Sequence, residues 1–326
     1  MRQIQFEYTD KEQLHKMLNK ISQWNKSSMT SLVVFDIFSQ ELRSVELSTI
    51  TAMIIKEIPG AMYRGCTTNG NILNGGYSGA NTIITCTIFE YPTTKVEMIQ
   101  LRLTNDTEKE VTDQLIKAVE ERPWVKAVEM LVTIRGMSMT GLCEDLSSIR
   151  EGVEIFGGGA FGPEFNENAA YVFSNVGECS DKSGVFMLIG GDDMHIMTTH
   201  ITGWKPLGRE LHVTKAKGSV LYELDGKPAY DTYYRFLKIK NDENFFTNTL
   251  EFPFFYEHKG INILRAPIAS NPDGSLNMTA DMEMNVKARI AYGDPWTILD
   301  SVRQGCIAIG KFQPELIHVY SCAARR

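Results

Sequence analysis

The sequence contains neither a signal-peptide core nor a long apolar run. Its first ten residues, MRQIQFEYTD, lack the apolar stretch of a secretory signal. No apolar segment approaches the ~20 residues that a membrane-spanning helix needs. Lys and Arg do not cluster among aromatic residues, and the formal net charge of −7 is opposite to that of a nucleic-acid-binding surface. We therefore predict a cytoplasmic protein that binds neither a membrane nor nucleic acid.

Paired cysteines and metal-ligand clusters are missing as well. No CxxC motif occurs, and six cysteines are scattered along the 326 residues: Cys66, Cys86, Cys143, Cys179, Cys306 and Cys322. This distribution is typical of reduced thiols in a cytoplasm. His195 and His200 lie five residues apart in an expected strand, so their side chains point to opposite faces. We predict no bound metal and no cofactor.

Apolar periodicity predicts alternating strands and helices. The composition, 43% hydrophobic and 22% charged, is that of a globular protein with room for two domains. Capping boxes are predicted at Thr9 with Glu12 and at Thr107 with Glu110, and an N-cap at Asp294. Helices are predicted over 9–22, 44–58, 107–121, 139–151 and 294–309. Buried strands include SLVVFDIF (31–38), KAVEMLVTI (126–134), MHIMTTHITGW (194–204) and, as the last one, ELIHVYSC (315–322).

Three consecutive glycines stand in the stretch EIFGGGAFGPEF, residues 154–165. A dinucleotide site needs such a turn to open a helix, and a P-loop needs a following Lys-Ser/Thr pair. Neither condition is met, because another strand is expected after PEFNENAA. The glycines therefore indicate that a strand end approaches something closely, and both a neighbouring backbone and a ligand remain open.

The order strand, helix, glycine-containing strand and further strands occurs twice. The two copies are about 93 residues apart when Gly65 is aligned with Gly158. We predict an α+β fold of two mixed-sheet domains with helices packed on the sheets, the first containing an internal duplication. The predicted domains are a helical lead at 1–30, a first domain at 31–218 with units 31–121 and 126–218, and a second domain at 219–326.

Several short motifs stand out along the chain: RGCTTNG (64–70), FGGGAFG (156–162), GWKPLG (203–208), VLYELDGKPAYDTY (220–233), DGSL (273–276) and YSCAARR (320–326). In sequence and in order they resemble motifs of the FIST family of intracellular sensor domains. The resemblance implies FIST N-like and FIST C-like domains that bind small ligands such as amino acids. It also implies a C-terminal output module, such as a diguanylate cyclase, a chemoreceptor-type segment or a histidine kinase. Family members continue beyond the last motif, so Arg326 is expected to be a truncation point.

The candidate ligand-binding residues lie in these glycine segments and in the last motif. A guanidinium binds a carboxylate through two hydrogen bonds, while hydroxyl and amide groups orient a small polar ligand. The candidates are Arg64, Cys66, Thr67, Thr68, Asn69, Gly157, Gly158, Gly159, Cys322 and Arg325. Solvated arginines and polar groups that merely satisfy a turn are the structural alternatives.

Small-ligand sensing is the predicted function, with no catalytic residue assigned. One alternative is an enzyme that uses Cys66 or Cys322, which requires a lowered thiol pKa and a neighbouring base. The other alternative is a protein-binding scaffold without a small ligand. The predicted partners are a small molecule and the output domain, and a homodimer is left open.

Overall fold

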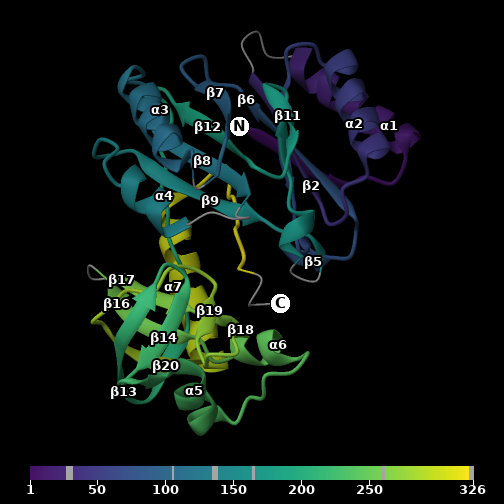
Figure 1. Ribbon diagram of the computed structural model, residues 1–326. Helices are drawn as coiled ribbons and strands as arrows, with labels where there is room; N and C mark the ends of the chain where they lie inside the picture. The colour runs from purple at the N-terminus through teal and green to yellow at the C-terminus, as the bar shows by residue number, and fades with distance from the viewer. Residues whose placement is uncertain (27–31, 105, 134–138, 164–165, 259–260, 323–326) are drawn as a thin grey trace. The chain divides into compact units, whose positions relative to one another are not determined.

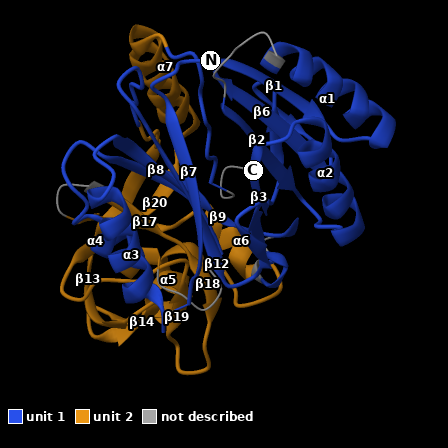
Figure 2. Cartoon of the chain, turned by 90° about the horizontal axis from the view of Figure 1, so that it is seen from above, with its two compact units in different colours: residues 1–137, 142–198, 314–326 blue, residues 138–141, 199–313 orange. Residues whose placement is uncertain are grey.

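The computed structural model describes residues 1–26, 32–104, 106–133, 139–163, 166–258 and 261–322. They form two compact units, which Figure 2 colours separately. Unit 1 comprises Met1–Met137, Leu142–Thr198 and Pro314–Arg326, and unit 2 comprises Ser138–Gly141 and Thr199–Gln313. Helices occur together with mixed sheets in unit 1 and with antiparallel ladders in unit 2, which confirms the predicted α+β class. The domain limits given above remain predictions.

Two sheets form the centre of unit 1. The first has the order β1-β6-β2-β3-β10-β11, and the second has the order β7-β12-β8-β9. The strands of the first sheet are β1 (Arg2–Glu7), β2 (Leu32–Ser39), β3 (Met62–Thr67), β6 (Thr82–Phe89), β10 (Val172–Ser174) and β11 (Gly177–Ser180). Those of the second are β7 (Lys95–Arg102), β8 (Val125–Thr133), β9 (Glu154–Ala160) and β12 (Ser183–Gly190). A separate hairpin consists of β4 (Asn71–Leu73) and β5 (Gly76–Ser78).

The two sheets repeat one topology, because β1-β6-β2-β3 corresponds to β7-β12-β8-β9. In the first copy β2 and β3 are parallel, and β6 is antiparallel to β2. In the second copy β8 and β9 are parallel, and β12 is antiparallel to β8. The helices alternate with these strands and are α1 (Lys11–Lys26), α2 (Ser44–Glu57), α3 (Glu108–Glu120) and α4 (Met139–Leu146). The repeat therefore begins with β1 and β7. Residues 1–30, which were predicted as a helical lead, contain β1 as well as α1.

The register of the parallel ladders corrects the alignment of the two copies. Gly65 pairs with Ile37 in the first copy, and Gly157 pairs with Met130 in the second. A β-carbon on either glycine would lie 2.0 Å from the carbonyl oxygen of that partner. Gly65 thus corresponds to Gly157, one residue earlier than the sequence alignment placed it. At these two positions glycine is required by the approach of a neighbouring backbone.

In unit 1, apolar side chains pack on both the outer and the inner face of the first sheet. On the outer face of the first sheet, apolar side chains of α1 and α2 such as Leu14, Ile21 and Ile54 pack against strand residues such as Phe35. On the inner face, a cluster joins the two sheets through Cys66, Leu131, Ala160, Val172 and Val185. Figure 1 shows α1 and α2 on one outer side of unit 1 and α3 and α4 on the other. Unit 1 is therefore a layered structure in which the two sheets face each other.

Unit 2 is built on one antiparallel sheet with the order β17-β16-β20-β13-β14-β19-β18, and β15 pairs with β14. Its core includes Leu211, Val213, Leu224, Tyr233 and Phe254. The strands are β13 (Trp204–Lys217), β14 (Val220–Leu224), β15 (Lys227–Pro228), β16 (Phe254–His258), β17 (Ile261–Arg265), β18 (Pro267–Ser270), β19 (Leu276–Met278) and β20 (Lys287–Gly293). The helices are α5 (Ala229–Leu237), α6 (Phe245–Leu250) and α7 (Pro295–Phe312).

Only one of the three predicted helix caps is present. Asp294 caps α7, since its Oδ2 accepts a hydrogen bond of 3.0 Å from the Thr297 amide. At α1 the cap is Asp10, whose Oδ1 accepts from the Gln13 amide at 2.8 Å, and not Thr9. Thr107 precedes α3 without a side-chain cap, because its hydroxyl donates to the Arg102 carbonyl instead. Both predicted capping boxes are wrong.

The predicted strands at 194–204 and 315–322 are also wrong. Residues 194–203 belong to no strand, and neither do Pro314–Cys322, here called the C-terminal segment. In the latter, His318 is partly buried whereas Ile317 and Val319 are 53% and 64% exposed. The segment therefore has the alternation of a strand without the backbone ladder. It belongs to unit 1, where Glu315 accepts a hydrogen bond of 2.8 Å from Tyr91 and forms an ion pair with the Met1 ammonium.

Among the residues described here, no helix has both the length and the apolar character needed to cross a membrane.

Candidate functional site

A fully buried arginine lies between the two sheets of unit 1. Arg64 Nε donates to Asp36 Oδ1 at 2.7 Å, and Arg64 Nη2 lies 2.7 Å from Glu129 Oε2. The side chains of Arg64, Asp36 and Glu129 are 0%, 3% and 1% exposed. Asp36 is the direct ladder partner of Arg64 across β2 and β3, whereas Glu129 comes from β8 of the facing sheet. The inner surfaces of both sheets therefore contribute to one ionic cluster.

The ion pairs keep the buried groups charged. Burial disfavours the charged form of Glu129, but the charges of Arg64 and His318 outweigh it and hold the pKa of that carboxyl well below its usual range. Burial also opposes the charge of Arg64, and the two carboxylates overcome this and raise its pKa. The cluster is thus maintained by mutual compensation, and removal of one member leaves a buried charge without its partner.

Donors of the arginine are left over. Among the described residues, no atom accepts a well-formed hydrogen bond from the buried Nη1 or Nη2 of Arg64; Nη2 still makes the close ion-pair contact with Glu129 Oε2, whereas Nη1 has no such contact. Buried polar groups are nearly always paired, because an unpaired one loses the free energy of its hydration. A guanidinium offers its donors in a fork that matches a carboxylate. The free Nη1 group is therefore a position at which a ligand oxygen would be stabilised.

The C-terminal segment covers the other side of Glu129. His318 Nδ1 lies 2.8 Å from Glu129 Oε1, and the Tyr320 hydroxyl donates to the same oxygen. The Tyr320 ring packs near Phe156, with ring centroids 6.4 Å apart. A β-carbon on Gly158 would come within 3.2 Å of that ring. The absence of a side chain at Gly158 therefore leaves room for Tyr320.

The repeat explains the composition of the cluster. Asp36 pairs with Arg64 in the first copy, and at the corresponding ladder position Glu129 pairs with Phe156 in the second. Each copy therefore supplies one carboxylate, and at this pair of ladder positions the first copy also supplies a cation, Arg64. Burial opposes the protonation of His318, yet the charge of Glu129 outweighs it and raises the pKa of the ring. Protonated His318 balances the second carboxylate.

Two family models match the chain along most of its length. The model of the FIST N domain matches residues 33–227, and that of the FIST C domain matches residues 229–326. The chain belongs to the FIST family. FIST domains are sensor domains in signalling proteins. Searches of curated proteins and of solved structures found no match to this FIST chain.

The other candidates in the first glycine segment of this FIST chain hold local structure. Thr67 Oγ1 accepts a hydrogen bond of 2.9 Å from the Tyr171 amide, and the Thr67 carbonyl accepts one from Phe161. Thr68 Oγ1 donates to Asn71 Oδ1 at 3.0 Å. Asn69 is buried beside them with 9% exposure. These polar groups join β3 to the segments before β10 and after β9.

The cysteine candidates differ in their surroundings. Cys66 follows Arg64 on β3 and is buried, and burial raises the pKa of its thiol to about 12. A thiol of this kind is protonated at neutral pH and is a poor nucleophile. Cys322 is exposed at the end of the C-terminal segment. Arg325 lies outside the described residues, so its prediction stays as it was.

The structure thus places Arg64 in the cluster and Gly158 against the Tyr320 ring, while Gly157 and Gly159 pair with Met130 and Val132 of β8. Sequence analysis did not single out four of the residues that form it: Asp36, Glu129, His318 and Tyr320. A signal for two of them was present. Asp36 and Glu129 are each an acidic residue within an otherwise apolar predicted strand, and they occupy equivalent positions in the two copies.

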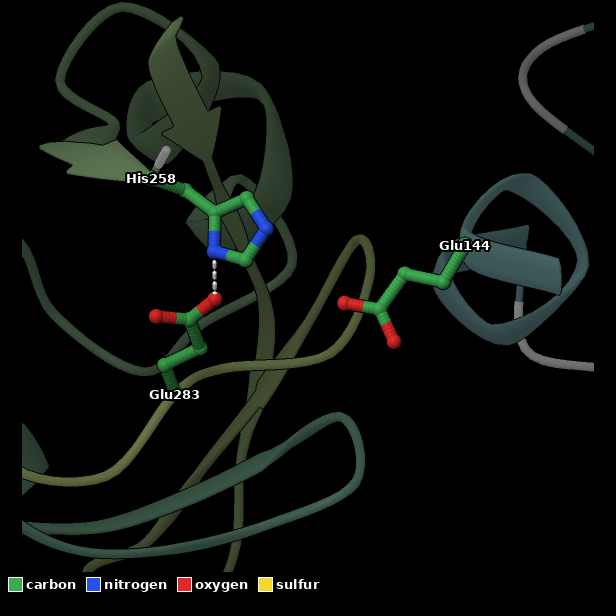
Figure 3. Close-up of side chains that lie close together, drawn as sticks. All are labelled: Glu144, His258 and Glu283. Atoms are coloured by element: carbon green, nitrogen blue, oxygen red, sulfur yellow. Dashed lines mark ion pairs between the residues drawn. The ribbon is translucent and has the colours of Figure 1, made fainter. Parts of the chain in front are cut away.

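A second histidine–carboxylate pair of the FIST chain lies in unit 2. His258 Nδ1 forms an ion pair with Glu283, as Figure 3 shows. The third side chain in that view, Glu144, belongs to unit 1. Within the described part of unit 2, no further His, Cys, Asp or Glu joins the pair at ligand distance. Two ligand atoms are fewer than the three or four protein ligands of a zinc site, so we assign no metal to this pair.

Proposed function

We propose that this chain is a cytoplasmic sensor that binds an amino acid or a related small carboxylate at the Arg64 cluster of unit 1. On this proposal, binding is passed to a C-terminal output module such as a diguanylate cyclase. The observation that carries the proposal is the buried Nη1 group of Arg64, which has no acceptor among the described residues. We assign no catalytic step to the chain.

The chemistry of Arg64 supports a carboxylate ligand. Nε donates to Asp36 and Nη2 lies in ion-pair contact with Glu129, whereas Nη1 has neither kind of partner among the described residues and is available to an additional oxygen. Charge-assisted hydrogen bonds of this type are short and strong. Because the guanidinium is held on two sides, little side-chain freedom is lost when a ligand binds. Arg64 is therefore pre-organised for one more anionic or carbonyl oxygen.

The C-terminal segment supports a site that can open. Its backbone joins no ladder, and its contacts with the cluster are made by the side chains of His318 and Tyr320. Ligand binding that moves such a segment shifts a conformational equilibrium, provided that the ligand prefers one state. The segment follows α7 directly in the chain, so its movement is covalently linked to unit 2.

A thermal-shift screen of the whole chain tests the proposal. Amino acids, the matching simple carboxylates and nucleotides form the panel. A ligand at about 100 times its dissociation constant adds about 2.7 kcal/mol to the apparent stability. Binding by any amino acid or carboxylate is then measured by calorimetry with Arg64→Lys, which keeps the charge but loses the fork.

We expect Arg64→Lys to weaken binding at least tenfold. Arg122→Lys is the matched control, because Arg122 also pairs with a carboxylate in unit 1 but is partly exposed. Binding unaffected by Arg64→Lys would refute the site. No response across amino acids and carboxylates would refute the ligand class and favour the scaffold alternative.

A further inference from the structure

We propose that Glu129 is a subsite for an organic cation, and that His318 and Tyr320 occupy it as a built-in competitor of the ligand. The cation would be the ammonium group of an amino acid or another primary amine. The inference rests on the proposed function and deepens it, since it distinguishes amino acids from simple carboxylates. Binding of the amine would displace the C-terminal segment.

The first argument is the charge of the cluster. Among the described residues, two carboxylates, Asp36 and Glu129, share one permanent cation, Arg64. All three side chains are nearly inaccessible to water, and in such a buried environment an uncompensated charge is strongly unfavourable. Among the described residues, the charged groups that face His318 are Asp36, Glu129 and Arg64. The Tyr320 hydroxyl, from the same C-terminal segment as His318, also lies at Glu129. The cluster therefore requires one further cation, and His318 supplies it when protonated.

The second argument is the asymmetry of the repeat. Glu129 stands where Asp36 stands in the first copy, but Phe156 stands where Arg64 stands. The second copy thus keeps the acidic position without an arginine of its own. Arg64 of the first copy contacts Oε2 of Glu129, and the group beside Oε1 is His318, which comes from outside the repeat. A ligand amine can replace it without breaking a contact within the repeat.

The third argument is the way in which the position is filled. Glu129 Oε1 interacts with two separate groups, the His318 ring and the Tyr320 hydroxyl. A single ammonium group carries three donors and can satisfy the same oxygen. The competing segment is held by side chains and not by a ladder, and it is anchored separately through Glu315 to Met1 and Tyr91. It can therefore leave Glu129 while its beginning remains attached.

Chemical rescue of His318→Ala tests the subsite without knowledge of the natural ligand. The whole chain is melted in methylammonium chloride, in imidazole at pH 6 and in potassium chloride of equal ionic strength. We expect His318→Ala to melt below the native chain, and both organic cations to raise its midpoint by a few degrees relative to potassium. In His318→Ala/Glu129→Gln the organic cations should have no more effect than potassium.

The matched control is His258→Ala, which removes the histidine of the partly exposed pair with Glu283 in unit 2. It should show no specific response to the organic cations. If His318→Ala does not respond, or if the double variant and His258→Ala respond equally, the subsite is refuted.

A second measurement uses the native chain, in case the variants fold poorly. The ring of His318 is followed by NMR while methylammonium is added. Displacement should lower its raised pKa toward the ordinary value of about 6.5. An unchanged pKa at saturating methylammonium would overturn the competitor role. The proposed function has a separate test, because the rescue experiment uses cations alone. It is refuted when the binding of amino acids and carboxylates does not depend on Arg64.

Discussion

Replacement of Arg64 by methionine removes the guanidinium that contacts both Asp36 and Glu129 and keeps a side chain of similar length. Both carboxylates then remain buried without their common partner. Breaking a buried ion pair in this way destabilises a protein by about 3–5 kcal/mol. Since 1 kcal/mol corresponds to about 2–4 °C for a domain of ~150–250 residues, we expect the midpoint of unit 1 to fall by about 6–20 °C at pH 7.

The loss should depend on pH in a definite direction. In the native chain, the pKa of Glu129 is below its unfolded value, so its contribution is present above about pH 4.3 and is lost as the pH falls further. In Arg64→Met, the largest of the charges that lower the pKa of Glu129 is lost, so burial raises its folded pKa relative to that in the native chain. Relative to the native chain, the variant then loses stability as the pH rises. The difference between the two chains is largest near pH 7 and shrinks below about pH 4.3.

Calorimetry of both chains at pH 7, 5.5 and 4 measures this difference. Arg209→Met serves as the control, because Arg209 forms a 2.7 Å pair with Asp225 but is 59% exposed. Exposed pairs of this kind contribute about 0–1 kcal/mol. The combined variant Asp36→Asn/Arg64→Met/Glu129→Gln should recover part of the loss at pH 7. A native midpoint in Arg64→Met, or a loss independent of pH, would refute the account of the cluster.

Four further predictions follow from single positions. Iodoacetamide at pH 8 should label the exposed cysteines of the native chain long before Cys66, as mass spectrometry can show, because burial raises the pKa of that thiol to about 12. Gly157→Ala should unfold or strongly destabilise unit 1 in thermal melts, since the new β-carbon would lie 2.0 Å from a carbonyl oxygen, whereas Gly79→Ala meets no atom within 4 Å and should be neutral. Asp294→Ala should lower the melting temperature of unit 2 and not that of unit 1. The stabilisation from protonated His318 is present below about pH 6.5 and is lost as the pH rises through its raised folded pKa, so His318→Gln should lower the midpoint more at pH 6 than at pH 9.

The fold class and most helices could be predicted because their signals are local. Apolar spacing located α2 at Ser44–Glu57 and α3 at Glu108–Glu120 to within a residue or so. The wrong predictions concern elements whose structure depends on an interaction partner. Buried and exposed side chains do alternate within 315–322 as in a strand, but the backbone of this segment pairs with no other strand. Periodicity in the sequence does not reveal whether a neighbouring strand is present. The capping box at Thr9 failed because the adjacent residue, Asp10, caps the helix instead by accepting from the Gln13 amide.

The candidate site was predicted in part. Arg64 was singled out by its place before a glycine segment, although a solvated side chain was the alternative then left open. Its complete burial depends on Glu129 from the facing sheet, which lies far away in the sequence. The role of His318 was hidden for a similar reason, since its partner Glu129 lies 189 residues away in the sequence. Contacts between distant segments decide this site, and local patterns do not encode them.

The comparison of the two copies adds a physical reason for placing function at this cluster. The copies agree where the backbone requires it, since Gly65 and Gly157 make the same close approach. They also agree in the acidic positions, Asp36 and Glu129. A purely structural role would be served by a second arginine, which would close the cluster within the repeat. The second copy has Phe156 instead, and its missing cation is supplied by a segment without backbone pairing. A position that is unfavourable when empty and is filled by a removable group has the properties that ligand exchange needs.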